Sequence, residues 1–220
     1  MDPFLHPYLQ QLLKDKDEFL VNLRKEADEN NIHIVREDTG ALLRFLVKMH
    51  RPARILEAGT AIGFSSTLMS KAYEEVCPGQ YPQIDTVELD PDIAAIARGN
   101  HKKAGLSNVH VILGDAAEVF SCLTGKYDMI FIDSAKSQYI QMYDDIKRLL
   151  KPGGLLVSDN VIFYGKIYDA PEEAPRKHRA IITNLRAFLE KLMGDSDFTS
   201  TILDIGDGVT LSYLNTTVVS

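Results

Sequence analysis

The stretch that decides the fold is residues 54–66, which read RILEAGTAIGFSS. A short apolar run ends at Glu57, two glycines follow at Gly59 and Gly63, and a helical pattern begins at Ser65. This order predicts a buried strand, a tight turn and the start of a helix. Glycine in such a turn permits positive φ or a close approach to a ligand, and the unpaired N–H groups of the helix start point to the same place. The stretch therefore indicates a nucleotide-binding turn.

The acid in this turn indicates the charge of the ligand. Dinucleotide-binding turns follow the pattern G-x-G-x-x-G, whereas this chain has Glu57-x-Gly59-x-x-x-Gly63, with an acid in place of the first glycine. A carboxylate at the end of the strand would repel a pyrophosphate and attract a cation. S-adenosylmethionine, which carries an ammonium and a sulfonium group, is such a ligand. The motif alone fits equally well a generic turn in which Glu57 is solvated.

Length and composition narrow the class of protein. A chain of 220 residues that is 45% hydrophobic can bury one substantial core, so we expect a single domain over 1–220. No long apolar run or signal-like start is present, which predicts a protein of the cytoplasm without a membrane segment. Cys77 and Cys122 have no metal-binding spacing and are expected to be ordinary thiols. The net charge of −7 argues against wholesale nucleic-acid wrapping but permits a local basic patch.

Strand and helix patterns alternate along the rest of the chain. Strands are expected at the opening run, 84–89, 109–113, 127–133 and 155–158, and as a hairpin of 199–205 and 209–213 around Gly206-Asp207-Gly208. Helices are expected at 7–30, after a cap at Asp38 or Thr39, from Ser65, after Asp90-Pro91, at 138–150 and at 176–193. The pattern predicts an α/β fold with a mostly parallel sheet covered on both faces, an antiparallel C-terminal hairpin and N-terminal helices within 1–50, ahead of a core in 51–220. Ligands should bind at the carboxyl ends of the strands.

Acidic residues follow the parallel strands at this edge. An acid after the second strand commonly accepts hydrogen bonds from ribose hydroxyls, which is the function expected of Glu88. Asp115, with the backbone amide of Ala116, could recognise an adenine edge, although a helix cap is an equally good interpretation of Asp115. Both residues are therefore candidates for cofactor binding.

A second group of residues at this edge indicates a metal. Asp133, Asp159 and Asn160 end two strands that should be neighbours, so two carboxylates and an amide oxygen could converge. Such oxygen ligands suit Mg²⁺, Ca²⁺ or Mn²⁺, and a cation would relieve the repulsion between the carboxylates. Each residue taken alone is more often a cap or turn residue. Lys136 lies three residues after Asp133 and is a candidate general base for a substrate hydroxyl, although its spacing alone fits a solvated lysine as well.

Together these motifs resemble the cation-dependent O-methyltransferases of the catechol and caffeoyl-CoA type. The motifs are Glu57-x-Gly59-Thr60-x-x-Gly63-x-Ser65, Val87-Glu88-x-Asp90, Gly114-Asp115-Ala116, Phe131-Ile132-Asp133-x-x-Lys136, and Lys151-x-Gly153-Gly154 followed by Asp159-Asn160-Val161. The resemblance covers nearly the whole chain and implies a Rossmann-like class I methyltransferase fold with a seven-stranded sheet. It implies a metal site, for which we expect Mg²⁺, at Asp133, Asp159 and Asn160, with Lys136 as the base. The residues it implies for S-adenosylmethionine binding are Glu57, Gly59, Thr60, Gly63, Ser65, Glu88, Asp115, Ala116 and Asp133. The family often has a second acid between Asp133 and Lys136, where this chain has Ser134-Ala135.

Two classes of acceptor supply the neighbouring oxygens that such a metal site requires. One is a catechol-like small molecule, and the other is 5-hydroxyuridine at the wobble position of tRNA. Residues 159–165, the basic run at 176–179 and the closing Gly-Asp-Gly resemble the bacterial members that methylate this nucleoside. Cations oppose the dipole at a helix start, so binding to a phosphate backbone would explain the basic run, as would an exposed turn with no partner. Aromatic residues that could stack on a flat ring, or simply close the loop, are Phe163, Tyr164 and Tyr168. We favour tRNA.

Other interpretations are less consistent with the motifs. A nicotinamide-dependent dehydrogenase is disfavoured because Glu57 replaces the first glycine of the dinucleotide pattern. A non-catalytic cofactor-binding module would have no need for Asp133, Asp159, Asn160 and Lys136 together. The resemblance also implies a homodimer, for which the amphipathic N-terminal helices could supply the surface, although they could equally form a lid over the active site.

Overall fold

The computed structural model describes residues 7–216 and contains one seven-stranded sheet. The strands are β1 (Arg54–Ala58), β2 (Gln83–Glu88), β3 (Val109–Leu113), β4 (Tyr127–Ile132), β5 (Leu150–Ser158), β6 (Phe198–Leu203) and β7 (Val209–Leu214). Their order across the sheet is β3-β2-β1-β4-β5-β7-β6. Neighbours from β3 to β5 are parallel, whereas β7 is antiparallel to both β5 and β6. The predicted mostly parallel sheet with an antiparallel C-terminal hairpin is therefore confirmed.

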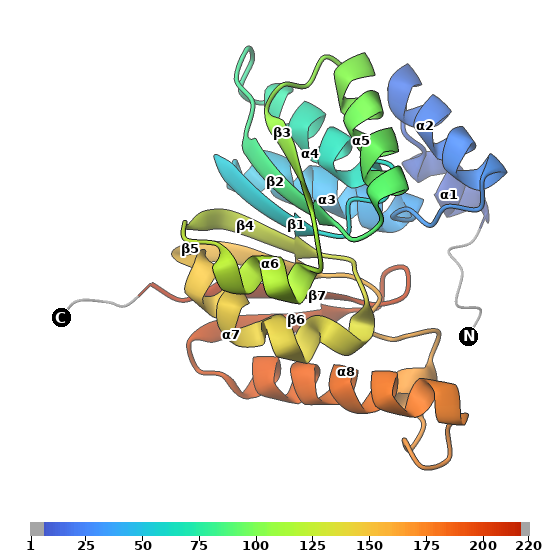
Figure 1. Cartoon of the computed structure of the whole chain (residues 1–220), viewed down its shortest axis with the longest axis vertical. Helices are drawn as coiled ribbons and strands as arrows, with labels where there is room; N and C mark the ends of the chain where they lie inside the picture. The colour runs from blue at the N-terminus through green and yellow to red at the C-terminus, as the bar shows by residue number, and fades with distance from the viewer. Residues whose placement is uncertain (1–6, 217–220) are drawn as a thin grey trace.

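Helices cover both faces of this sheet (Figure 1). They are α1 (Pro7–Leu13), α2 (Glu18–Glu29), α3 (Glu37–His50), α4 (Phe64–Glu74), α5 (Pro91–Lys103), α6 (Ala116–Cys122), α7 (Tyr139–Leu149) and α8 (Arg176–Gly194), with short 3₁₀ turns η1 (Lys136–Gln138) and η2 (Lys166–Tyr168). In Figure 1, α3, α4 and α5 lie on one side of the sheet and α6, α7 and α8 on the other. Within residues 7–216, no helix is both long and apolar enough to cross a membrane.

Alternation along the central strands builds the two cores. On β4, Met129 and Phe131 pack with the cluster that contains the N-terminal helices and α4, whereas Ile130 and Ile132 pack with the cluster of α6, α7 and α8. All four side chains are fully buried. Successive residues of a strand point to opposite faces, so a central strand covered on both sides is apolar throughout. This is why residues 129–132 form an unbroken apolar run in the sequence.

Several predicted boundaries are wrong for local reasons. The expected helix over 7–30 is interrupted, because the Asp17 side chain accepts a hydrogen bond from the Leu20 N–H and starts a new helix. Helix α3 begins after Arg36, so neither Asp38 nor Thr39 caps it. Helix α6, for which the sequence offered only a possible cap at Asp115, spans Ala116–Cys122. The strand predicted to start at Leu155 starts at Leu150, where its pairing with β4 shifts register. The Asp90 cap of α5 is confirmed, since its carboxylate accepts from the N–H groups of Asp92 and Ile93.

An ion pair between α7 and the end of α8 gives a prediction for acid stability. Asp195 accepts hydrogen bonds from the Lys147 ammonium at 2.6 Å and the Tyr143 hydroxyl at 2.7 Å. Burial alone would raise the pKa of Asp195, but these bonds prevail and lower it to about 2. Because the folded pKa lies below the unfolded one, the stabilisation is present above about pH 4 and lost as the pH falls towards 2. Asp195→Asn should lower the free energy of unfolding at pH 7 by roughly 1–2 kcal/mol and flatten its pH dependence in that window.

Urea unfolding between pH 2.5 and 7 measures this effect. The matched control is Asp197→Asn, because Asp197 also lies beside Lys147, at 2.7 Å, but is 65% exposed. If the two variants lost the same free energy of unfolding, burial of Asp195 would not be what makes its ion pair stabilising.

Candidate functional site

A cavity of about 230 Å³ opens at the carboxyl ends of β1, β2, β3 and β4. This is the edge at which the sequence predicted ligand binding. The cavity is lined by seven of the nine predicted cofactor residues, namely Gly59, Thr60, Ser65, Glu88, Asp115, Ala116 and Asp133. The other two, Glu57 and Gly63, do not line it and act from behind the wall, as described below.

The glycine turn after β1 forms one wall and requires glycine at two places. The N–H groups of Gly59 and Thr60 both donate to the Val87 carbonyl oxygen, which folds the turn against the end of β2. Gly59 has φ +99°, and a Cβ there would overlap the carbonyl oxygen of Asp133. Gly63 has φ +84°, and a Cβ there would lie 2.5 Å from Nε2 of the buried His101. The two glycines thus let the turn pack between the backbone of Asp133 and α5.

This packing predicts a strong effect of Gly59→Ala. The substitution adds backbone strain of about 1–3 kcal/mol and forces the turn away from Asp133. We expect at least a tenfold loss of S-adenosylmethionine affinity, measured by calorimetry, together with a lower melting temperature. Gly99→Ala is the matched control, because Gly99 lies in helix α5 with open space at its Cβ position. That variant should keep full affinity and gain about 0.5–1 kcal/mol of stability. Unchanged affinity in Gly59→Ala would contradict this account of the turn.

Glu57 is fully buried beneath the cavity and positions one of its lining residues. Its two carboxylate oxygens accept hydrogen bonds from Ser65 Oγ and Thr86 Oγ1, each at 2.5 Å. Burial raises the pKa of Glu57 to about 7, although these two hydrogen bonds oppose the rise. The Ser65 hydroxyl donates to Glu57, so the acid fixes the side chain that lines the cavity from the start of α4. A solvated Glu57, which the sequence left open, is excluded.

Glu88 and Asp115 form the opposite wall, and both carboxylates already bind backbone amides. Glu88 accepts from the N–H groups of Ala61 at 2.9 Å and Asp90 at 3.0 Å. Asp115 Oδ1 accepts from Ala117 N, as the cap of α6, and its Oδ2 accepts from Gln138 Nε2 at 2.6 Å. The hydrogen bond from Gln138 is the main reason that the pKa of Asp115 is lowered. The cap interpretation of Asp115 is therefore confirmed, and recognition of adenine stays a prediction, because a carboxylate oxygen can accept more than one hydrogen bond.

The predicted metal ligands lie side by side at the ends of β4 and β5. The Asp133 N–H donates to the Ala58 carbonyl and the Asp159 N–H to the Ile132 carbonyl, so the two backbones continue the sheet. Asp159 is only 1% exposed and its Oδ1 accepts from the N–H of Asn160 at 2.7 Å. Burial, and then the charge of Asp133, raise the pKa of Asp159 to about 8. The two buried carboxylates therefore raise the cost of each other's charge, which the positive charge of Lys136 offsets only in part.

Lys136 reaches the same group from the η1 turn. Its Nζ donates to Asn160 Oδ1 at 3.0 Å. Burial raises the pKa of Asp133, and the positive charges of Lys136 and His33 oppose that rise. Among residues 7–216, no three side chains of His, Cys, Asp or Glu converge on one point, so a cation here would need the amide oxygen of Asn160 as its third donor. Carboxylate and amide oxygens are the donors that Mg²⁺ and Mn²⁺ prefer, and the residues present fit such an ion.

The sequence analysis did not predict all the residues that line the cavity. His33, Ile34 and Val35, from the segment between α2 and α3, close one side. Gln138, which binds Asp115, closes another. The apolar run at 32–35 is visible in the sequence, but nothing in its pattern shows that it folds back over the ends of β1 and β4.

Comparisons with known proteins agree with the fold and the site. Residues 10–214 match the family described as O-methyltransferase. The catechol O-methyltransferase of Niastella koreensis is 31% identical over 205 residues, which cover 90% of this chain and 88% of that protein. The caffeoyl-CoA O-methyltransferase of Stellaria longipes is 27% identical over 220 residues, or 94% of this chain and 88% of that protein. The solved structure of the O-methyltransferase TomG from Streptomyces achromogenes, in complex with SAM, superposes with a TM-score of 0.81 at 28% identity and covers 95% of both chains.

The sheet order and the position of the cavity define a Rossmann-like methyltransferase fold of class I. The chain belongs to the O-methyltransferase family, and it is an S-adenosylmethionine-dependent O-methyltransferase of the catechol and caffeoyl-CoA type. The predicted resemblance is confirmed at this level.

Proposed function

We propose that the protein methylates a hydroxyl that neighbours a second oxygen, in a reaction that depends on a divalent metal. The observation that carries this proposal is the convergence of Asp133, Asp159, Asn160 and Lys136 beside the cavity. The charge of Asp133 raises the pKa of the buried Asp159, and a bound cation would relieve this repulsion. A site that only bound S-adenosylmethionine would have no reason to keep this arrangement.

S-adenosylmethionine would bind in the cavity between the glycine turn and the ends of β2, β3 and β4. Gly59, Thr60 and Ser65 would face its methionine portion, and Glu88 would accept hydrogen bonds from the ribose hydroxyls. Asp115 and the backbone of Ala116 would contact the adenine edge. Asp133 would lie between the cofactor and the metal, since it lines the cavity and also neighbours Asp159.

The chemistry supplied by a bound Mg²⁺ is Lewis-acid activation of two neighbouring acceptor oxygens. Asp133, Asp159 and Asn160 would hold the ion. Lys136 Nζ, 3.0 Å from Asn160 Oδ1, would accept the proton of the acceptor hydroxyl. The acceptor oxygen would then form a bond to the methyl carbon as the bond from that carbon to sulfur breaks, which requires the two in line.

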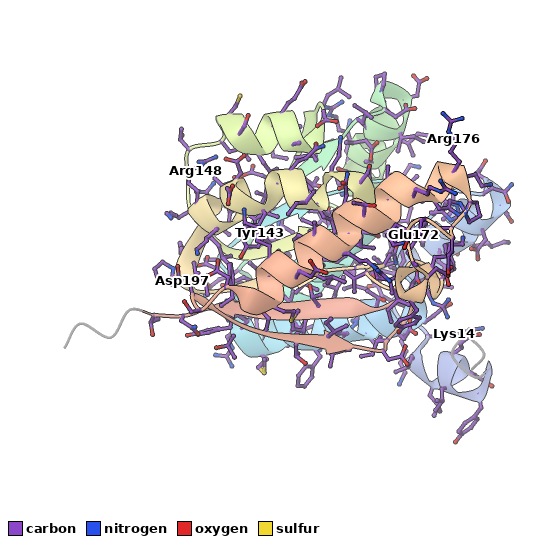
Figure 2. The ribbon with its side chains drawn as sticks, turned by 90° about the horizontal axis from the view of Figure 1, so that it is seen from below. Lys14, Tyr143, Arg148, Glu172, Arg176 and Asp197 are labelled. Carbon is purple, nitrogen blue, oxygen red and sulfur yellow. The ribbon has the colours of Figure 1, made fainter. Side chains whose placement is uncertain are left out.

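For the acceptor we propose 5-hydroxyuridine in tRNA. Tyr164 and Tyr168, which follow the metal ligands along the chain, are 60% and 72% exposed and offer rings for stacking on a base. Arg176 and Lys177 are exposed at the start of α8, and Figure 2 shows the Arg176 side chain directed away from the ribbon. Cations at a helix start oppose the helix dipole, and a phosphate backbone would offset that cost.

His178 and Arg179, the second half of the basic run, contact other parts of the protein. Arg179 Nε donates to the Ala174 carbonyl, and the His178 ring packs edge-on against Phe163 with centroids 5.4 Å apart. A phosphate contact is therefore proposed only for Arg176 and Lys177.

Catechol-like small molecules are the second candidate acceptor. The observation in their favour is that relatives matching nearly the whole chain are named catechol and caffeoyl-CoA O-methyltransferases. A catechol supplies the same pair of neighbouring oxygens and would need no contact with the basic run.

Transfer of labelled methyl from S-adenosylmethionine separates these candidates. The acceptors are tRNA from cells that lack this gene and, in parallel, a simple catechol, each with Mg²⁺ and with EDTA. We expect label in tRNA only with the metal, and a lower tRNA affinity for Arg176→Ala/Lys177→Ala at unchanged catechol turnover. Label in catechol alone would overturn the RNA proposal, and equal transfer with EDTA would overturn the metal.

We also propose that the chain works as one methyltransferase domain and forms a homodimer in the cytoplasm, where tRNA is found. Large apolar side chains stand exposed on α1 and α3, which contact each other. They are Tyr8, Leu12, Phe45 and Met49, each about 60% exposed. Sedimentation of Phe45→Glu against wild type tests this surface: a monomeric variant supports the dimer, and a monomeric wild type contradicts it and favours a lid.

A further inference from the structure

The segment directly after Asp159 has an unusual backbone. Of the six described non-glycine residues with positive φ, three lie here, namely Asn160 at +57°, Phe163 at +53° and Tyr164 at +54°. Asparagine tolerates this conformation, but for aromatic residues it costs of order 1 kcal/mol or more each. Such a backbone persists only where surrounding contacts hold it. Residues 160–165, here called the acceptor segment, therefore need a clamp.

The clamp is the turn between β6 and β7. The Ile162 N–H donates to the Asp207 carbonyl at 2.8 Å and the Val161 N–H to the Gly208 carbonyl at 3.0 Å. The Asp207 side chain adds a third bond, because its Oδ1 accepts from the N–H of Tyr164 at 2.5 Å. Gly208 has φ +83°, and a Cβ there would overlap the Ile162 side chain, so the turn fits closely against the segment.

The turn is itself anchored to α3. The Gly206 N–H donates to Asp38 Oδ2 at 3.0 Å, and the Thr39 N–H donates to the other oxygen of Asp38 at 2.9 Å. A Cβ at Gly206 would lie 2.9 Å from Thr39 Oγ1. Asp38 was expected as a possible cap of α3 but is not one; its side chain instead connects this helix to the turn.

Asp207 differs from an ordinary turn residue in its burial. It is only 9% exposed, and its Oδ2 has no hydrogen-bond partner among residues 7–216. A buried carboxylate costs several kcal/mol unless something compensates for it. Lys136 and Lys166 both lie near enough to stabilise its charge. Lys136 also donates to Asn160, so its positive charge is shared between Asp207 of the turn and Asn160 of the acceptor segment.

We propose that Asp207 is a positioning residue for the acceptor side of the active site, an inference that rests on the proposed function. Through Tyr164 it holds the acceptor segment, and the segment sets the orientation of Asn160 towards Lys136. Lys166 directly follows the acceptor segment, and its ammonium lies 4.9 Å from the Phe163 ring centroid and 5.5 Å from that of Tyr164. The cofactor cavity contains no residue of the segment or the turn. Loss of Asp207 should therefore impair use of the acceptor and spare cofactor binding.

Three variants of Asp207 test the proposal. Asp207→Asn keeps an oxygen that can accept from the Tyr164 N–H, whereas Asp207→Ala removes it and Asp207→Glu moves it by one methylene. The matched control is Asp204→Ala, an exposed acid of the same hairpin. The readouts are hydrogen–deuterium exchange of residues 160–168, the dissociation constant of S-adenosylmethionine, and KM and kcat for the acceptor with Mg²⁺.

We expect Asp207→Ala to raise exchange in 160–168 and to reduce kcat/KM for the acceptor by about 10- to 100-fold, the effect of losing a hydrogen bond to a charged group. Cofactor affinity should stay within twofold, Asp207→Asn should recover most of the loss, and Asp207→Glu should not. If Asp207→Glu recovers kcat/KM and Asp207→Asn does not, the residue acts through its charge alone and the proposal is overturned. If Asp207→Ala does not fold, wild-type hydrogen–deuterium exchange of residues 160–168 in both the Asn and the Glu variant would also overturn it. If wild type methylates neither tRNA nor catechol, the proposed function fails, while the exchange data still decide the role of Asp207.

Discussion

Methyl transfer by Asp159→Ala should fall by at least about 100-fold at saturating S-adenosylmethionine, because the variant loses one of the two carboxylates of the proposed metal site. Asp159 is almost completely buried, so its side chain cannot be replaced by a nearby surface acid. Lewis-acid activation by a metal contributes several kcal/mol to the transition state, and each 1.4 kcal/mol corresponds to a tenfold change in rate. The dissociation constant of S-adenosylmethionine should change little, because Asp159 does not line the cofactor cavity.

Asp159→Asn separates charge from shape in this prediction. The amide is nearly isosteric and keeps an oxygen that can accept from the Asn160 N–H, so the local fold should survive. Manganese affinity, followed by electron paramagnetic resonance, should drop in both Asp159 variants and stay normal in Asp92→Asn, an exposed acid at the start of α5. Removal of a buried like-charge contact could even stabilise the metal-free protein, since Asp133 raises the pKa of Asp159. Turnover in Asp159→Asn equal to wild type, with and without EDTA, would contradict a metal at this place.

The sheet and its ligand-binding edge were predictable because they depend on patterns that span many residues. The run 129–132 is apolar and fully buried, as expected for a strand covered on both faces. The positions of Asp133 and Asp159 then follow, since parallel neighbours bring their carboxyl ends together. Asp133, Asp159, Asn160 and Lys136 were thus placed near one another before any side chain was seen.

The parts that failed depend on single side chains competing for backbone groups. Asp17 starts a new helix inside an apolar pattern that continues without a break, and Asp38 binds Gly206, a residue 168 positions away. Neither choice has a periodic signature. The loop with His33 has the same difficulty, because only the folded sheet gives it a surface to close over.

Glu57 lies in a different environment from the one that the sequence interpretation assumed. The sequence interpretation gave this acid a direct attraction for a positive ligand. The structure instead buries it under Ser65 and Thr86, with a pKa of about 7. If Glu57 acts on the cofactor through the orientation of Ser65, Glu57→Gln should lower cofactor affinity less than Ser65→Ala does.

The second large effect is expected at Lys136. Replacement by alanine should reduce kcat by about 10²- to 10⁴-fold, the usual contribution of a general base, with cofactor affinity within twofold.

The variant Lys136→Arg separates a base from a fixed charge. Its guanidinium keeps the positive charge and can still donate to Asn160, but it does not release its proton at working pH. If Lys136 accepts the acceptor proton, the arginine variant should be nearly as slow as alanine. Recovery of activity in Lys136→Arg would show instead that the residue acts as a fixed positive charge that orients Asn160, and the base would then have to be sought among other groups at the acceptor side.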